Sequence, residues 1–306
     1  MNWFFIALIG PFLYATTNYF DKYLLDKYFK VGESGAIILF SSLFAFVALP
    51  VIYLIDPAVF SLSWTNIVVL TLNGTLNIFC LILYFKSLQD SEVSMVIPFY
   101  QTIPIFGFIL GYFILGEKIG MMEILACLLI ILGTTIISLD LTGEKIRFKK
   151  KVVVLMLTAS LLYAVNGVVF KMIAVDAGFW SSAFWGFVGK VALGGLIFVL
   201  VKSYRYQFLE IFKKNSSTVL SLVSLNEVIF IAAEGVSIYA TLLAPIVLVM
   251  TVNGFQPFFV FLFGILLTIF FPKIGKEVLE KKVLIQKIVA IAFIIGGTLL
   301  LGPNIL

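Results

Sequence analysis

The feature that most constrains this chain is a succession of apolar segments, each about 20 residues long, separated by short polar stretches. A segment of that length, wound as an α-helix, crosses the hydrocarbon core of a bilayer. We expect the segments at residues 2–23, 34–55, 65–88, 93–115, 121–140, 152–174, 179–201, 216–242, 245–271 and 283–301. The sequence therefore predicts an all-α integral membrane protein with ten transmembrane helices.

The composition supports this class, because 62% of the 306 residues are hydrophobic, 12% are charged and the mean hydropathy is +1.14. Such a chain cannot present a water-soluble surface. No Lys or Arg precedes Lys22, so the first segment lacks the basic start of a signal peptide and is expected to remain as a span. We predict a multi-pass protein of the cell (plasma) membrane, with the lipid bilayer as its surroundings.

The charged stretch from Asp140 to Lys151 divides the chain into two halves of five segments each. If the halves are copies, an odd number of spans places the second upside down relative to the first, as in many secondary transporters. We therefore predict a first repeat at 1–140, a charged linker at 141–151 and a second repeat at 152–306.

Short matches in the same order support a duplication. They pair Leu13-Tyr14-Ala15 with Leu162-Tyr163-Ala164, Leu72-Asn73 with Leu225-Asn226, Pro104-Ile105-Phe106 with Pro257-Phe258-Phe259, and Gly133-Thr134 with Gly297-Thr298. Apolar sequences produce chance similarity easily, but a shared order is harder to obtain by chance.

The distribution of basic residues predicts the orientation. The connections after spans 1, 3, 5, 7 and 9, with adjoining span ends, hold 18 of the 21 Lys and Arg residues; the others are Lys118, Lys171 and Lys190. Because cytoplasmic loops are enriched in Lys and Arg, this count places both termini outside.

Several motifs of the first half resemble the EamA repeat of the drug/metabolite transporter superfamily. They are Tyr84-Phe85-Lys86-Ser87-Leu88, Val96-Ile97-Pro98-Phe99, Pro104-Ile105-Phe106, Leu115-Gly116-Glu117-Lys118-Ile119 and Ile131-Leu132-Gly133. In the second half Pro257 and Gly296-Gly297 fit the pattern, whereas Phe270-Phe271-Pro272-Lys273 stands where Gly-Glu-Lys is expected.

This resemblance implies an EamA-type ten-helix transporter with a substrate cavity between the halves, which moves small organic metabolites such as amino acids or nucleosides. Family members are often drawn with cytoplasmic termini, which conflicts with the charge count. We retain the orientation that the charges predict. The alternative substrate class is a lipid-linked or cationic amphiphilic compound, which acidic residues without a neighbouring lysine would favour.

Ionisable residues inside spans are the strongest indication of a site, because each is costly in hydrocarbon unless it faces a polar interior. Glu227 and Glu234 lie two helical turns apart on one face of the eighth span, and Lys190 lies within the seventh. One interpretation is a cavity wall with a carboxylate that binds a substrate amine or a proton. The other is a buried Glu–Lys pair that only joins two helices.

Amides and tyrosines inside spans complete the predicted substrate-binding set. With Glu227, Glu234 and Lys190 it comprises Asn73, Asn77, Tyr100, Gln101, Tyr14, Asn18, Tyr163, Asn166, Asn226, Asn253 and Gln256. Any single amide can simply join two helices. Together they indicate an interior site lined by both halves.

The sequence argues against catalysis and cofactor chemistry. It has no histidine, no phosphate-binding glycine loop and no nucleophile beside a histidine base, so an enzyme or an ATP-driven pump is not expected. Cys80 and Cys127 lie in apolar segments and predict neither a disulfide nor a metal site. We expect no cofactor, no nucleic acid, protons as a candidate coupling ion, and a monomer or homodimer.

The predicted orientation can be tested in intact cells. Cysteines placed in the 141–151 linker, in a background lacking Cys80 and Cys127, should be shielded from membrane-impermeant thiol reagents until the cells are lysed. Labelling without lysis would show that the linker lies outside.

Overall fold

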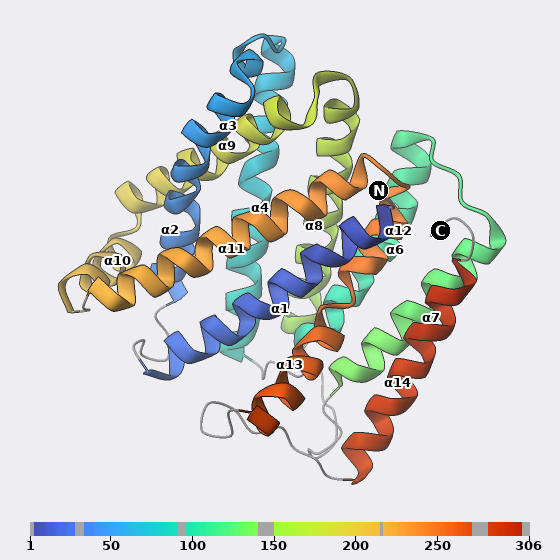
Figure 1. The fold of residues 1–306 in the computed structure, drawn as a ribbon. Helices are drawn as coiled ribbons and strands as arrows, with labels where there is room; N and C mark the ends of the chain where they lie inside the picture. The colour runs from blue at the N-terminus through green and yellow to red at the C-terminus, as the bar shows by residue number, and fades with distance from the viewer. Residues whose placement is uncertain are drawn as a thin grey trace.

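The helices follow the apolar segments of the sequence, as the computed structural model shows (Figure 1). The structure describes residues 3–27, 34–90, 96–139, 150–214, 217–270 and 281–301. Within those ranges every regular element is helical, which confirms the all-α class. Residues 141–149 of the predicted linker lie outside the described ranges, and Lys150 already begins a helix.

The elements of the first half are α1 (Trp3–Lys27), α2 (Ser34–Phe44), η1 (Ala45–Val47), α3 (Ala48–Ile55), η2 (Pro57–Phe60), α4 (Trp64–Asp90), η3 (Ile97–Thr102), α6 (Ile103–Leu110), η4 (Gly111–Leu115) and α7 (Met121–Ser138). Those of the second half are α8 (Lys150–Ala177), α9 (Phe179–Leu200), α10 (Lys202–Lys214), α11 (Ser217–Thr241), α12 (Ile246–Asn253), α13 (Gln256–Phe270) and α14 (Lys281–Leu300).

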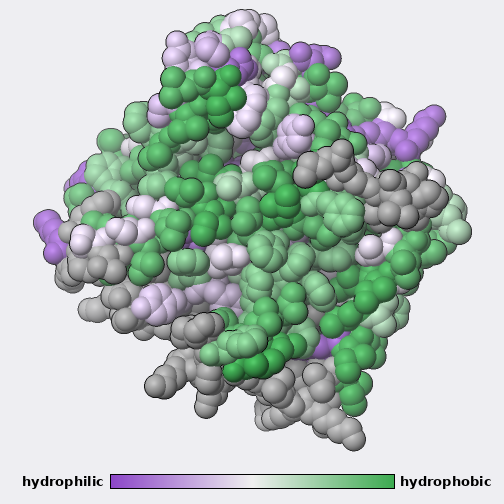
Figure 2. Space-filling view, viewed as in Figure 1, coloured by the Kyte–Doolittle hydropathy of each residue, from purple (hydrophilic) through white to green (hydrophobic). Residues whose placement is uncertain are grey.

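Many of these helices are long and apolar enough to cross a membrane. In the described ranges six stretches qualify fully: Gly35–Ile55, Trp64–Ser87, Lys150–Ala177, Phe179–Leu200, Val219–Thr241 and Ile246–Leu267. Shorter apolar helices cover Phe99–Leu115, Met121–Ile136 and Ile285–Leu300. Large apolar side chains face outward, as at Leu54 (79% exposed) and Phe113 (78%), and hydrophobic residues cover much of the face in Figure 2. This outer surface fits hydrocarbon rather than water, so the chain is a multi-pass membrane protein.

Three of the predicted spans are interrupted helices. The span predicted at 34–55 is divided into α2 and α3 by the 3₁₀ turn η1. In the span predicted at 93–115, a 3₁₀ turn (η3) precedes α6 and a π-helical turn (η4) follows it; Pro98 and Pro104 each remove one backbone donor. The span predicted at 245–271 is divided into α12 and α13, just before Pro257. Pro245 lies immediately before α12 and so marks a helix start.

The helices α7 and α14 lie side by side and contact each other through a reciprocal pair of glycines (Figure 1). A Cβ on Gly133 of α7 would meet Ala290 and Ile294 of α14, and a Cβ on Gly297 of α14 would meet Ala126 and Ile130 of α7. Gly133 thus faces the residues seven and three positions before Gly297, and Gly297 faces the residues seven and three positions before Gly133. Two helices related in this way run antiparallel.

A second close approach joins α4 to α9. A Cβ on Gly74 would lie 1.9 Å from the carbonyl oxygen of Gly186, and a Cβ on Gly189 would lie 1.9 Å from that of Thr71. Only glycine allows the two backbones to come this close. The contact holds Asn73 and Lys190, which neighbour these glycines, at the interior of the bundle, where both are buried.

The helix α10 was missed by the sequence analysis, which treated residues 202–215 as a connection. Its Tyr204 and Phe208 pack on apolar residues of α2 and α9, while Tyr206 is 67% exposed. Its low overall hydropathy hid the helix, although apolar residues at 204, 208 and 211 have helical spacing.

Substitution of the glycines at the α4–α9 contact should destabilise the protein. A methyl group in Gly74→Ala or Gly189→Ala has to push two backbones apart, and overpacking of this kind costs about 1–3 kcal/mol. We expect a lower melting temperature in detergent for both variants.

The matched control is Gly195→Ala in α9, where the added Cβ would meet nothing within 4 Å. Equal melting temperatures for Gly189→Ala and Gly195→Ala would contradict the close contact.

Candidate functional site

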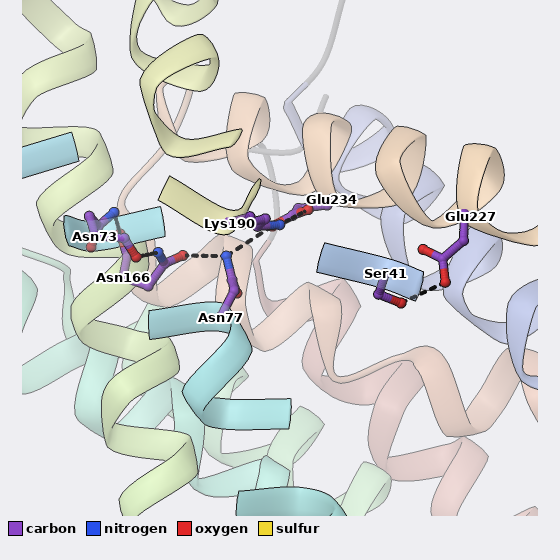
Figure 3. Close-up of polar contacts among 7 residues, drawn as sticks. All are labelled: Ser41, Asn73, Asn77, Asn166, Lys190, Glu227 and Glu234. Atoms are coloured by element: carbon purple, nitrogen blue, oxygen red, sulfur yellow. Dashed lines mark hydrogen bonds and ion pairs between the residues drawn. The ribbon is translucent and has the colours of Figure 1, made fainter. Parts of the chain in front are cut away.

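The centre of the bundle contains a chain of polar side chains that begins with two asparagines (Figure 3). Asn73 of α4 donates from Nδ2 to the backbone oxygen of Asn166 in α8 at 3.0 Å, and Asn166 donates from Nδ2 to the backbone oxygen of Asn73 at 2.9 Å. Both residues are buried. These reciprocal bonds join α4 to α8 and turn polar groups away from lipid.

The chain continues through Asn77 to an ion pair (Figure 3). One turn along α4, Asn77 donates from Nδ2 to Glu234 Oε1 at 2.9 Å and lies 3.4 Å from Asn166 Oδ1. The Lys190 ammonium of α9 contacts both carboxylate oxygens of Glu234. Lys190 and Glu234 are both buried, where an unpaired charge is costly because the dielectric is low. Each therefore depends on the other to compensate its charge.

A small cavity lies beside this ion pair. Its volume is about 20 Å³, room for about one water molecule. Its walls come from both halves of the chain: Asn77, Tyr163, Asn166, Gly167, Glu234, Ser237, Ile238, Thr241, Met250 and Asn253. The space at this polar centre is therefore too small for a metabolite.

Two predicted tyrosines meet at the same place. Tyr14 of α1 and Tyr163 of α8 lie against each other and close to Glu234, and the ring of Tyr14 also packs edge-on against Phe230 at 5.4 Å. They occupy matching positions in the repeat that the sequence predicts. Of the predicted set, the structure thus brings together Glu234, Lys190, Asn73, Asn77, Asn166, Asn253, Tyr14 and Tyr163.

Glu227 is not part of this centre, although it shares a helix face with Glu234. Its Oε1 accepts a 2.5 Å hydrogen bond from Ser41 of α2. The adjacent Asn226 donates from Nδ2 to Asp21 Oδ1 of α1 at 2.7 Å. The sequence did not indicate Asp21 as a site residue, because Asp21 lies near the end of the first predicted span. In the structure, α1 continues beyond it to Lys27.

The remaining predicted residues lie apart from the ion pair. Gln101 accepts a hydrogen bond from the Thr134 hydroxyl of α7 at 2.8 Å, and the ring of Tyr100 packs near that of Tyr84 at 5.7 Å. Asn18 is exposed on α1, and Gln256 is half-buried at the start of α13. For Gln101 the observed contact is one that joins two helices.

The Leu-Gly-Glu-Lys motif has a structural explanation that spacing alone did not provide. Gly116 adopts a positive φ of 66°, which ends the helical turn. The Glu117 carboxylate then accepts a 2.8 Å bond from the Ile246 backbone N–H at the start of α12 and pairs with Lys171 of α8 at 2.5 Å. Lys171 also donates to the Ala244 carbonyl at 2.6 Å. The motif therefore connects α8 and the α11–α12 turn to the end of η4.

These observations define a multi-pass helical membrane protein with a buried, charged centre. The sequence model of the EamA-like transporter family matches residues 1–139, which confirms the predicted resemblance over that part of the chain.

The other two comparisons give one result each. No curated protein matches the chain. Among solved structures, 23 chains match; one, titled only "Crystal structure of protein", has a TM-score of 0.73, covers 99% of this chain and 97% of its own, and is 15% identical. This likeness shows the fold, and it extends through both halves.

The ion pair should behave as one unit in a double-mutant cycle. Glu234→Gln alone leaves the Lys190 charge buried without compensation, and breaking a buried pair in this way costs about 3–5 kcal/mol. Lys190→Met combined with Glu234→Gln removes both charges and should melt at a higher temperature than Glu234→Gln alone. Additive losses in thermal melts would show that the two side chains do not interact.

Proposed function

We propose that the chain is a secondary transporter that carries a small organic metabolite across the cytoplasmic membrane by alternating access. The observation that supports this most is the polar centre, where both halves contribute to a cavity beside a buried ion pair. Ionisable groups inside transmembrane segments are rare, and they mark substrate or ion pathways in many carriers. A central site between two halves also matches the general design of such carriers.

The two halves are proposed to be inverted five-helix repeats, 1–140 and 152–306. The reciprocal glycine contact of α7 with α14 supports a two-fold relation, because each helix presents the same positions to the other. Because α7 and α14 are antiparallel, a two-fold axis that relates them is perpendicular to both helices. For helices that cross the membrane, such an axis lies in the membrane plane. The pairs α4–α8 and α1–α11 fit the same relation, and each is joined by the repeated asparagine, Asn73 or Asn226.

The proposed two-fold relation makes the helix pair α4–α9 equivalent to the pair α11–α2, but the two pairs are not packed equally tightly. The helices α4 and α9 touch along their backbones, whereas the equivalent helices α11 and α2 have only a light contact that includes the Ser41–Glu227 bond. Alternating access requires an equilibrium between two such arrangements. We propose that the central site opens by separation of α2 from α11, because the contact between these two helices is the lighter one.

The charges of the site favour a substrate with both an amine and a carboxylate, such as an amino acid. A zwitterion could take the place of the internal partners, with its carboxylate on Lys190 and its amine on Glu234. Both buried charges would then stay compensated during exchange. A cationic amphiphile would leave Lys190 without a partner, so this site does not favour the alternative class.

Ligand-dependent stabilisation tests the proposal. The purified protein is screened by thermal shift against amino acids, nucleosides and sugar nucleotides, because a ligand at 100 times its Kd stabilises the native state by about 2.7 kcal/mol. We expect an amino acid to raise the melting temperature, and Glu234→Gln and Asn77→Ala to abolish that rise.

Exposed Asp176 provides the control, since Asp176→Asn should keep the ligand response. A transported substrate should also exchange in proteoliposomes. Stabilisation that persists in Glu234→Gln and Asn77→Ala would place the substrate elsewhere, and the absence of any stabilising amino acid would contradict the proposed substrate class.

A further inference from the structure

A second polar cluster lies beside the central site and belongs to three helices. It consists of Asp21 of α1, Ser41 of α2, and Asn226 and Glu227 of α11. The two carboxylates lie close enough to repel each other. None of these side chains lines the cavity beside Lys190 and Glu234.

The cluster has more acceptors than donors. Asn226 is 5% exposed and Glu227 6%, and among the described residues no protein group donates to Asn226 Oδ1 or Glu227 Oε2. The other polar atom of each side chain is already engaged within the cluster, with Asp21 for Asn226 and with Ser41 for Glu227. A buried acceptor without a donor costs about 1–3 kcal/mol, and more when it is charged.

Among the described residues, no cation is in direct contact with the two carboxylates of the cluster. Lys190 lies near enough to act on Glu227, but it is engaged by both carboxylate oxygens of Glu234. Two carboxylates at the edge of a hydrocarbon medium therefore share no cation of their own among the described residues. The buried charge of Glu227 is expected to pair with, or coordinate, a cation.

We propose that Asp21, Asn226 and Glu227, with Ser41 in support, form a binding site for a monovalent metal cation such as Na⁺ or K⁺. A metal ion contacts several oxygens at once, whereas a proton on Glu227 leaves Asn226 Oδ1 without a donor. Magnesium needs near-ideal octahedral geometry, which this small set does not supply. Asp21 is exposed on α1, so an ion can reach the cluster from its edge.

This site goes beyond the proposed transport function, because it can be measured without any substrate. A cation held here would bridge α1, α11 and α2, including the lightly packed α2–α11 contact. It would thereby stabilise one packing of these helices over another, which is the property that an ion needs in order to influence transport.

The test uses the purified full-length protein in choline chloride buffer without substrate. Choline is replaced stepwise by NaCl or KCl at constant ionic strength, and both the melting temperature and equilibrium binding of ²²Na⁺ or ⁸⁶Rb⁺ are measured. We expect saturable binding of one ion per chain with a matching rise in melting temperature. Glu227→Gln and Asp21→Asn should weaken binding at least tenfold.

Two control variants separate this site from its surroundings. Asp176→Asn removes an exposed carboxylate, and Lys190→Met combined with Glu234→Gln alters the central site without leaving a charge uncompensated; both should keep the cation response. Loss of binding in that double variant with retention in Glu227→Gln would move the ion to the central cavity and overturn the proposal.

The wild-type protein alone can also overturn it, even if a variant fails to fold. An equal response to choline, Na⁺ and K⁺ would show an ionic-strength effect only. Proton uptake on acidification without metal binding would make the cluster a protonation site, and saturable binding of Ca²⁺ or Mg²⁺ alone would contradict the monovalent assignment. Because these measurements contain no substrate, their failure leaves the metabolite proposal standing, and failure of the ligand screen leaves this one standing.

Discussion

The structure depends on the requirement that a polar group in a membrane interior find its partner inside the protein. The Lys190–Glu234 pair is the strongest case, since neither charge can be left alone in a medium of low dielectric. Asn77 extends the pair from α9 and α11 to α4, and the asparagine exchange with Asn166 extends it to α8. Four helices are thus held around one polar centre by side chains that lipid cannot satisfy.

Close backbone contact makes this centre possible. The asparagines are short, so α4, α8 and α9 must lie close together before their polar atoms can meet. The absence of a Cβ at Gly74 and Gly189 permits that approach between α4 and α9. In membranes, where lipid tails are as apolar as leucine, such packing contributes what the hydrophobic effect contributes in water. The same device recurs between α7 and α14 at Gly133 and Gly297.

The two glutamates of α11 illustrate how one helix face can serve two purposes. Glu234 is neutralised by a lysine and lines a small cavity, whereas Glu227 contacts a serine and lies near a second acid. Their spacing is the same whichever helices surround them. Their chemical difference comes from the neighbours, α9 and α4 for one and α1 and α2 for the other.

The sequence by itself determined the apolar segments and the interior positions of Glu234, Lys190, Asn73 and Asn166, because charged and amide groups are rare in hydrocarbon and stand out. It predicted the EamA resemblance from motifs that lie close together in the chain. Only the tertiary structure decided which polar residues meet, since Asn77, Lys190 and Glu234 belong to helices far apart in sequence. It also separated Glu227 from the centre, added Asp21 by extending α1, and made α10 a helix. The spacing of residues along one helix predicts which side chains share a face. The partners of those side chains depend on how the helices pack, and that packing is set by contacts between segments far apart in the sequence.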